Sequence, residues 1–486
     1  MTNLETSNAP GSASPRADDG NQGGASALPP ARDILRADFG AENNSVYEAL
    51  KLALVKNVDW SVKTGPSNAF HNHNAAWLVA AYRIGSDKAE LDDIVSDERN
   101  KSKIRVDVAG DQKEKLTITA NNWKNHLGKW NGREIGLYGL KAEQNFQAYA
   151  EFFRNEIAKR GVHGDGGVLA IYLPTLAKGL AGDFFHAVIE LGYFFESKEE
   201  ILLMQGLAWI AVAYVEIPGA ESGVDAMSPS GNDNFARPTE ALSALSRVEG
   251  GNNTVFLRQF NLNDGSSGYI DDIEALINNE ASFEKTCEYD FDFTNMGETQ
   301  LGCMLNDIQT AACDSFAAGG CVDFYTLHSV TGARAVWAIF GGISGNVASV
   351  DGAGNYSAPW VVNVKRSALS ALWRAILFTH VARNNPQIKR SGVFSWDAGE
   401  TLSTDSLTPW AELNAKALET KNEHIIKVVF SLADFYDREV QNPELWCLAD
   451  RVMHVREGKN SGLVGVGVGS RLQKFIDRIE CEEKMS

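Results

Sequence analysis

The chain has 486 residues, of which 44% are hydrophobic and 22% are charged, a composition typical of a globular protein with a large core. Its formal net charge at pH 7 is -18. Nucleic acids and anionic membranes favour basic surfaces, so this charge argues against both as partners.

The N-terminal segment, residues 1–35, is predicted to be a disordered tail. It is rich in Ala, Gly, Ser, Asn, Asp and Pro, and it lacks the apolar centre of a secretory signal. The longest uncharged apolar run, residues 201–215, is shorter than the roughly 20 residues that a membrane-spanning helix needs. We therefore expect a cytoplasmic protein. Its six cysteines contain no C-x-x-C pair, which favours reduced thiols.

Helical periodicity of the apolar residues dominates the rest of the chain. It predicts helices over residues 46–55, 74–83, 144–159, 183–195, 201–214, 365–381, 409–419, 424–436 and 445–454. Asp183 is a candidate N-cap for one of them. Because strand–helix alternation is absent, the sequence predicts a mainly α fold, with a single large helical domain over residues 36–480.

Two regions depart from this helical pattern. Residues 218–320 read as a loop-rich insertion, because Gly, Ser, Asn and Asp are frequent in their first half. Within it the stretch EYDFDF, residues 288–293, is a candidate strand. Residues 340–358 form a glycine-rich segment that we expect to be a loop.

Histidines recur at predicted helix starts or inside apolar helical runs, in five places. They are His71 and His73, His126, His186, His328 and His424. Each alone is more typical of a buried structural histidine, but five similar settings favour a shared polar centre. His186 and Glu190 are four residues apart and lie on one face of a helix. His71 and His73 point to opposite sides of a helix, so they bind one metal together only from an extended or capping backbone.

Lys427 shares a helix face with His424, three residues before it. A buried lysine loses its proton readily, and the neutral amine reacts with carbon dioxide to give a carbamate, which is an anionic metal ligand. The simpler interpretation, which composition favours, is that Lys427 pairs with Glu423 or another carboxylate at the surface.

Five stretches, in order, resemble segments of the questin oxidase-like proteins of fungal and related polyketide pathways. They are FHNHNAAWLVAAYRIGS, then NNWKNHLG with FQAYAEFFRNEIAKRG, then GDFFHAVIELGYFFE, LHSVTGARAV and EHIIKVVFSL. Together they cover most of residues 45–455. Each motif is weak alone, and their common order gives the resemblance its specificity.

The resemblance implies an oxidoreductase that uses O2 on a small aromatic substrate such as an anthraquinone, by ring cleavage or Baeyer–Villiger-like oxidation. It implies non-haem iron, Fe(2+), held by histidines with a carboxylated lysine. Separately from the resemblance, NADPH or another external reductant stays open as a partner of the reaction. The implied metal ligands are His71 or His73, His126, His186, His328, His424 and Lys427. The list is longer than a usual coordination sphere, so at least one member should lie outside it.

The chain departs from the family pattern near two of these histidines. Ala75, Ala76 and Trp77 stand where family members continue with further histidines, and Glu190 stands where the family has a second histidine. Glu190 is therefore a candidate carboxylate ligand or catalytic group, which would favour iron-like chemistry. The change also fits an altered substrate or a loss of activity.

The remaining site candidates are aromatic and cationic. A flat substrate needs an apolar pocket, for which the candidates are Trp77, Tyr82, Trp123, Phe185, Tyr193 and Tyr325, although core packing explains each equally well. Tyr193 and Arg334 complete the catalytic candidates with Glu190. Arg334 would pair with a phenolate or quinone oxygen, or would simply form a surface ion pair.

Three other functions compete with an oxygenase. A metal-dependent hydrolase uses the same ligand types, but its His-x-His pair sits on a barrel strand. A cofactor-using oxidase is the second alternative. It would need a dinucleotide site, but the glycine run at residues 462–470 lacks the downstream strand–helix unit of such a site. A helical family member without catalytic activity is the third alternative, and metal content would separate it from the other readings.

Overall fold

The computed structural model describes most of the chain between residues 35 and 457. The described residues are 35–36, 44–57, 63–64, 70–71, 73–101, 116–128, 138–219, 235–247, 276, 279–321, 323–344, 358–383, 385–388, 408–438 and 442–457. The predicted tail at 1–35 lies outside these residues up to residue 34, whereas Leu35 is described and buried against the core. The glycine run at 462–470 also lies outside them, as do 220–234, 248–275 and 345–357. Of the loop expected at 340–358, residues 340–344 are instead the end of a helix.

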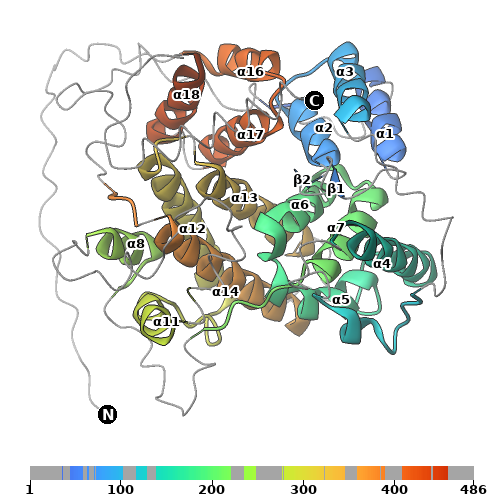
Figure 1. Cartoon of the computed structure of the whole chain (residues 1–486), viewed down its shortest axis with the longest axis horizontal. Helices are drawn as coiled ribbons and strands as arrows, with labels where there is room; N and C mark the ends of the chain where they lie inside the picture. The colour runs from blue at the N-terminus through green and yellow to red at the C-terminus, as the bar shows by residue number, and fades with distance from the viewer. Residues whose placement is uncertain are drawn as a thin grey trace, which may run out of the picture.

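The described residues confirm a mainly α fold, with fifteen α-helices (Figure 1). Those of the first half are α1 (Ser45–Asn57), α2 (Asn74–Arg83), α3 (Lys88–Lys101), α4 (Tyr138–Arg160), α5 (Val168–Leu176), α6 (His186–Ser197) and α7 (Glu200–Val212). Those of the second half are α8 (Pro238–Ser246), α11 (Glu280–Cys287), α12 (Glu298–Ala318), α13 (Phe324–Ser344), α14 (Pro359–Ala382), α16 (Trp410–Glu419), α17 (Glu423–Arg438) and α18 (Pro443–Glu457).

Shorter elements connect these helices. The strands β1 (Lys63–Thr64) and β2 (Phe70–His71) pair antiparallel just before α2. Three 3₁₀ turns, η2 (Trp123–His126), η3 (Ala177–Gly179) and η4 (Gly182–Phe185), precede longer helices, and η4 runs directly into α6.

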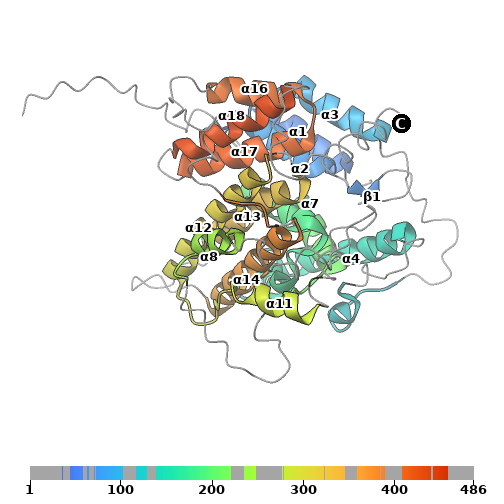
Figure 2. The same ribbon diagram turned by 60° about the vertical axis from the view of Figure 1, so that its left-hand side comes forward.

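Helix α13 is central, since it packs against α6, α12, α14 and α17. Figures 1 and 2 place α16, α17 and α18 together with α1, α2 and α3 on one side of α13, and α12 and α14 on the other. Small residues allow the closest packing in this region. A side chain at Gly192 of α6 would lie 2.7 Å from the Cα of Ala335 in α13, so glycine there lets the two helices approach.

The expected loop-rich character of residues 218–320 fails where the structure describes it after residue 278. Helix α12 alone has 21 residues, and its buried face, with Leu301, Ile308 and Phe316, joins the core against α13 and α14. The strand predicted at 288–293 is also wrong, because these residues form a turn and irregular backbone. The carboxylate of Asp290 in this stretch binds Arg374 of α14 at 2.8 Å, which fixes it without a strand partner.

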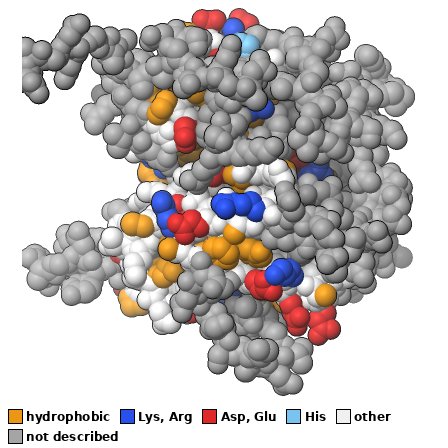
Figure 3. Space-filling model, turned by 90° about the vertical axis from the view of Figure 1, so that its left-hand side faces the viewer, with side chains coloured by type: hydrophobic (Ala, Val, Ile, Leu, Met, Phe, Trp, Pro, Cys, Tyr) orange, Lys and Arg blue, Asp and Glu red, His pale blue; other side chains and the backbone are white. Residues whose placement is uncertain are grey.

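The face in Figure 3 bears acidic, basic and apolar side chains of the described residues close together. On this face the described acidic groups therefore do not separate from the basic ones, despite the net charge of -18. No helix among the described residues is long and apolar enough to cross a membrane.

Candidate metal centre

Four histidines from distant parts of the chain meet at one point. One ring nitrogen from each lies within 4.8 Å of the others, and the four are His73, His186, His328 and His424. His73 directly precedes α2, His186 is the first residue of α6, His424 is the second of α17, and His328 lies in the second turn of α13. The N-terminal parts of four helices therefore converge here.

Two of the rings are oriented by backbone carbonyls. The Nδ1 of His186 lies 2.6 Å from the carbonyl oxygen of Asp183, and the Nδ1 of His328 lies 2.7 Å from that of Phe324. A carbonyl oxygen only accepts hydrogen bonds, so each Nδ1 carries the proton and each Nε2 presents a lone pair to the centre. This arrangement is how proteins orient metal-ligating histidines.

The Nε2 atoms are closer than neutral rings with facing lone pairs tolerate. The distance is 2.6 Å between His73 and His186, and 3.2 Å between His186 and His328. A cation between such lone pairs removes their repulsion. The donor set therefore fits a metal ion of the kind that imidazole binds, such as iron, copper or zinc.

A carboxylate orients the other two rings. One oxygen of Glu423 lies 3.3 Å from the Nδ1 of His73 and 3.3 Å from the Nδ1 of His424. Burial alone would raise the pKa of Glu423, but the two histidines outweigh it and hold that pKa well below its ordinary value. An ionised carboxylate behind two rings raises their basicity as ligands.

Two of the rings are held neutral, those of His73 and His328. Burial, followed by the nearby charge of Lys427, holds the pKa of His73 well below its ordinary range. Burial, followed by the charges of His424 and Lys427, does the same for the pKa of His328. Neutral imidazole is the form that binds a metal, so the site is prepared for one without first losing protons from these two rings.

A tight turn sets the position of His186. Asp183 and Phe185 in η4 have φ angles of 54° and 66°, a left-handed conformation that is rare for an aromatic residue. Asp183 was predicted to be an N-cap, which is wrong. Its side chain instead accepts a hydrogen bond from Nε1 of Trp209 at 2.7 Å, and the Trp209 ring stacks on His186. The turn is thereby fixed to α7.

The structure does not bring all of the predicted ligands together. His126 is partly exposed at the end of η2 and does not belong to the converging group. The backbone of His71 lies in β2, while its side chain is outside the described part of the structure. His73 is the one of these two candidates whose described ring lies at the centre.

Lys427 is buried, with 1% of its surface exposed. Lys427 follows His424 by three residues in α17, and an ammonium at this position would lower the pKa of both His73 and His328. The alternative of a surface pair with Glu423 is wrong, because Lys427 is not at the surface. The Glu423 carboxylate is shared between two histidines.

The three catalytic candidates are all buried in the fold. Glu190 is buried one turn beyond His186 and outside the converging group. Arg334 is buried rather than at the surface, in ion pairs with Glu196 and Asp434. The ring of Tyr193 packs against Arg334, at 5.5 Å from ring centroid to guanidinium carbon, and burial raises its pKa.

Phe324 lies against the cluster and was missed by the sequence reasoning. Its ring centroid is 4.3 Å from that of His328 and 5.0 Å from that of His424. Of the predicted pocket aromatics, Tyr325 is its neighbour and half-buried, whereas Trp77, Tyr82, Trp123, Phe185 and Tyr193 are buried in the core. The sequence signal for Phe324 was its position four residues before His328, because residues four apart share a helix face.

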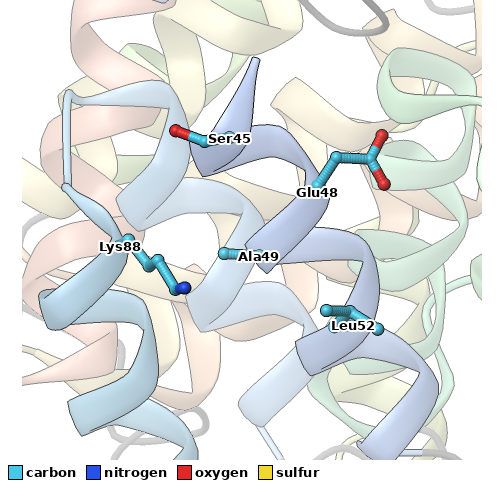
Figure 4. Close-up of a pocket in the computed structure, with 5 residues that line it drawn as sticks. All are labelled: Ser45, Glu48, Ala49, Leu52 and Lys88. Atoms are coloured by element: carbon cyan, nitrogen blue, oxygen red, sulfur yellow. The ribbon is translucent and has the colours of Figure 1, made fainter. Parts of the chain in front are cut away.

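A surface hollow of about 410 Å3 lies elsewhere, between α1 and α3 (Figure 4). Ser45, Glu48, Ala49 and Leu52 of α1 line it with Lys88 of α3. None of these residues belongs to the helices that carry the four imidazoles, so this hollow is separate from the candidate metal centre.

The sequence matches the questin oxidase-like family model over residues 70–432. The chain belongs to the questin oxidase-like family. The match begins just before His73 and ends after Lys427, so it includes all four converging histidines. No curated protein matches the sequence. Membership of this family agrees with an oxidase activity. The four histidines form a site that could bind a metal ion.

Proposed function

We propose that this questin oxidase-like protein is a metal-dependent oxygenase that oxidises a small aromatic, polyketide-type substrate with O2. Ring cleavage or Baeyer–Villiger-like oxygen insertion is the reaction. The observation that carries the proposal is the convergence of four imidazole nitrogens within 4.8 Å. The family match supports oxidase chemistry.

The metal that we propose is iron(II), held by His73, His186, His328 and His424. When bound, it would supply the one-electron chemistry that O2 needs in order to react with a closed-shell organic molecule. The chain contributes four imidazoles, each with a carbonyl or carboxylate oxygen beside its Nδ1, and the Glu423 carboxylate offsets part of the metal's charge.

The side from which the substrate approaches is suggested by burial. His186 and His328 are buried, whereas His424 and Phe324 are half-buried at the N-terminal ends of α17 and α13. We place the flat substrate against the Phe324 ring, where aromatic contact orients it beside the four histidines. The buried rings on the opposite side keep water from reaching the centre from the core.

For Lys427 we propose a carbamate, formed when its neutral amine adds carbon dioxide and releases one proton. A buried ammonium beside four metal-binding rings would repel the metal, whereas a carbamate is an anion and would attract it. Burial of the side chain, at 1% exposure, also protects a carbamate from water.

Replacement of Lys427 by methionine is expected to weaken iron binding and to remove a carbamate carbon signal from 13C NMR spectra recorded with labelled bicarbonate. Lys365 is the matched control, because it is a buried lysine that pairs with Glu298 and Ser344 away from the cluster. Lys365→Met should keep both the iron and the signal. A Lys427→Met protein with unchanged iron affinity would contradict the assignment.

The function is tested on protein prepared without oxygen and reconstituted with iron(II). We expect one iron per chain, and uptake of O2 when a hydroxylated anthraquinone is added. A dioxygenase places both oxygen atoms in the product, whereas oxygen insertion into one bond sends the second atom to water and consumes NADPH or another two-electron donor. Protein that binds no metal ion, or that consumes no O2 with any aromatic substrate tested, would overturn the proposal.

A further inference from the structure

A second set of contacts joins the same four helices farther from their N-terminal ends. We call it the arginine network, and it consists of Arg83, Glu196, Arg334, Asp434 and Arg438. The guanidinium of Arg334 in α13 pairs with Glu196 of α6 and, at 3.1 Å, with Asp434 of α17. Each helix that carries or directly follows one of the four histidines contributes at least one residue.

The outer arginines extend the network to α2 and along α17. Arg83 at the end of α2 lies 3.5 Å from Glu196, and Arg438 lies 3.2 Å from Asp434. Phe430 of α17 covers the Arg334 guanidinium at 4.1 Å. Arg334 and Asp434 are both buried, and a buried charge is stable only while its partners stay in place.

The spacing between the two levels is regular. Arg83 lies ten residues after His73, Glu196 ten after His186, and Asp434 ten after His424. Ten residues of α-helix rise about 15 Å. Arg334 lies six residues after His328, a rise of about 9 Å. The network is thus a second layer, separated from the rings by about three helical turns in three of the helices.

Two layers of contacts restrict helix movements that a single layer would allow. Four rigid helices that met only at their N-terminal ends could still slide or rotate relative to one another. A slide by a single residue moves a ligand by about 1.5 Å, whereas metal–ligand distances tolerate about 0.2 Å. Arg334 is suited to prevent this movement, because its fork holds α6 and α17 to α13 in fixed geometry.

We propose that the arginine network positions the four histidines, and that Arg334 is its central positioning residue. The inference rests on the proposed metal centre. It assigns Arg334 a role through the helices, in place of contact with a phenolate or quinone oxygen. The network sets the relative height of α2, α6, α13 and α17, and with it the distances between the four ring nitrogens.

The test is a titration of the metal-free protein with cobalt(II), followed by the visible absorption bands of the bound ion. Arg334→Met should weaken cobalt(II) binding about tenfold and shift the bands, which is the lower end of the range for loss of a partner bonded directly to a ligand. The cobalt(II) affinity of Arg334→Lys should lie between those of the wild type and Arg334→Met. Lysine keeps the positive charge but lacks the forked guanidinium.

Arg374 supplies the matched control. It is a buried arginine on α14 that pairs with Asp290 at 2.8 Å, and α14 carries none of the four histidines. Arg374→Met should lower the melting temperature much as Arg334→Met does, while cobalt(II) affinity and bands stay those of the wild type. Equal weakening in both variants would mean general destabilisation and would overturn the inference.

Arg438→Met is the second variant, should Arg334→Met fail to fold. It removes two hydrogen bonds at the edge of the network, one to the carboxylate and one to the backbone carbonyl of Asp434. Because the Arg334 contacts remain, we expect a smaller loss of cobalt(II) affinity in the same direction. If every folded network variant binds cobalt(II) with wild-type affinity, the role of the arginine network is overturned while the proposed function stands. A wild-type protein that binds no cobalt(II) or iron(II) overturns the proposed function as well, so the two failures are distinguishable.

Discussion

Replacement of His186 by alanine is expected to abolish metal binding and, with it, O2 uptake. The Nε2 of His186 is the atom that approaches the Nε2 atoms of both His73 and His328, at 2.6 and 3.2 Å. Changes in groups that merely orient a ligand cost about 10- to 100-fold in metal affinity. Loss of a ligand from the middle of the set should therefore cost more than about 100-fold.

The measurement is the metal content of the purified protein, together with the dissociation constant for iron(II). His380→Ala is the control, because His380 is also fully buried but lies in α14, where its Nδ1 is 2.8 Å from the hydroxyl oxygen of Ser315. Both variants lose a buried imidazole, and His380→Ala should keep its metal. Retention of iron by His186→Ala would contradict the candidate metal centre.

The helical fold was predictable because apolar periodicity is a local signal. The predicted helix at 74–83 matches α2 residue for residue, and that at 201–214 matches α7 within two residues. Helix α12 was missed because residues 271–320 mix apolar, small and polar side chains without a long apolar run. Burial against α13 and α14 decides its structure, and such contacts depend on distant parts of the chain.

The candidate site was only partly predictable, for a similar reason. Histidines at helix starts were visible in the sequence, but their meeting point depends on how four helices pack. His126 has a comparable setting and stays outside the cluster. The sequence suggests Glu423 only as a partner of Lys427. Nothing local indicates that one carboxylate serves both His73 and His424, which are 351 residues apart in the chain.

The fold also bears on the hydrolase alternative. That alternative required His-x-His on a barrel strand, because an extended backbone directs both rings to one side. The described chain has two-residue strands only, and His73 lies outside β2 with helical backbone angles, φ of -88° and ψ of -1°. The four converging rings come from helix ends, which is the arrangement that the oxygenase proposal uses.

Glu190→Gln is expected to stabilise the protein, by an amount that grows with pH. Glu190 is buried, and burial raises its pKa from 4.5 to about 8. Among the described residues, no hydrogen bond or ion pair to this carboxyl offsets the burial. The folded chain therefore keeps a proton that the unfolded chain releases. The free energy of unfolding should fall as the pH rises from 4.5 towards 8.

Glutamine has nearly the same shape and no such proton, so the variant should not show this fall. At pH 5 the two proteins should differ little in melting temperature. At pH 7 the wild type should be less stable by roughly 3 kcal/mol, since each pKa unit corresponds to about 1.4 kcal/mol. Thermal unfolding of metal-free protein across this pH range measures the difference.

Glu156 provides a control of opposite sign. Its carboxylate accepts hydrogen bonds from Tyr172 and Arg160, which outweigh burial and lower its pKa. Glu156→Gln should therefore destabilise the protein at neutral pH. A constant difference between Glu190→Gln and the wild type at all pH values would show that Glu190 is not protonated in the fold. Loss of bound iron in Glu190→Gln would instead make Glu190 a ligand, the role that its position four residues after His186 first suggested.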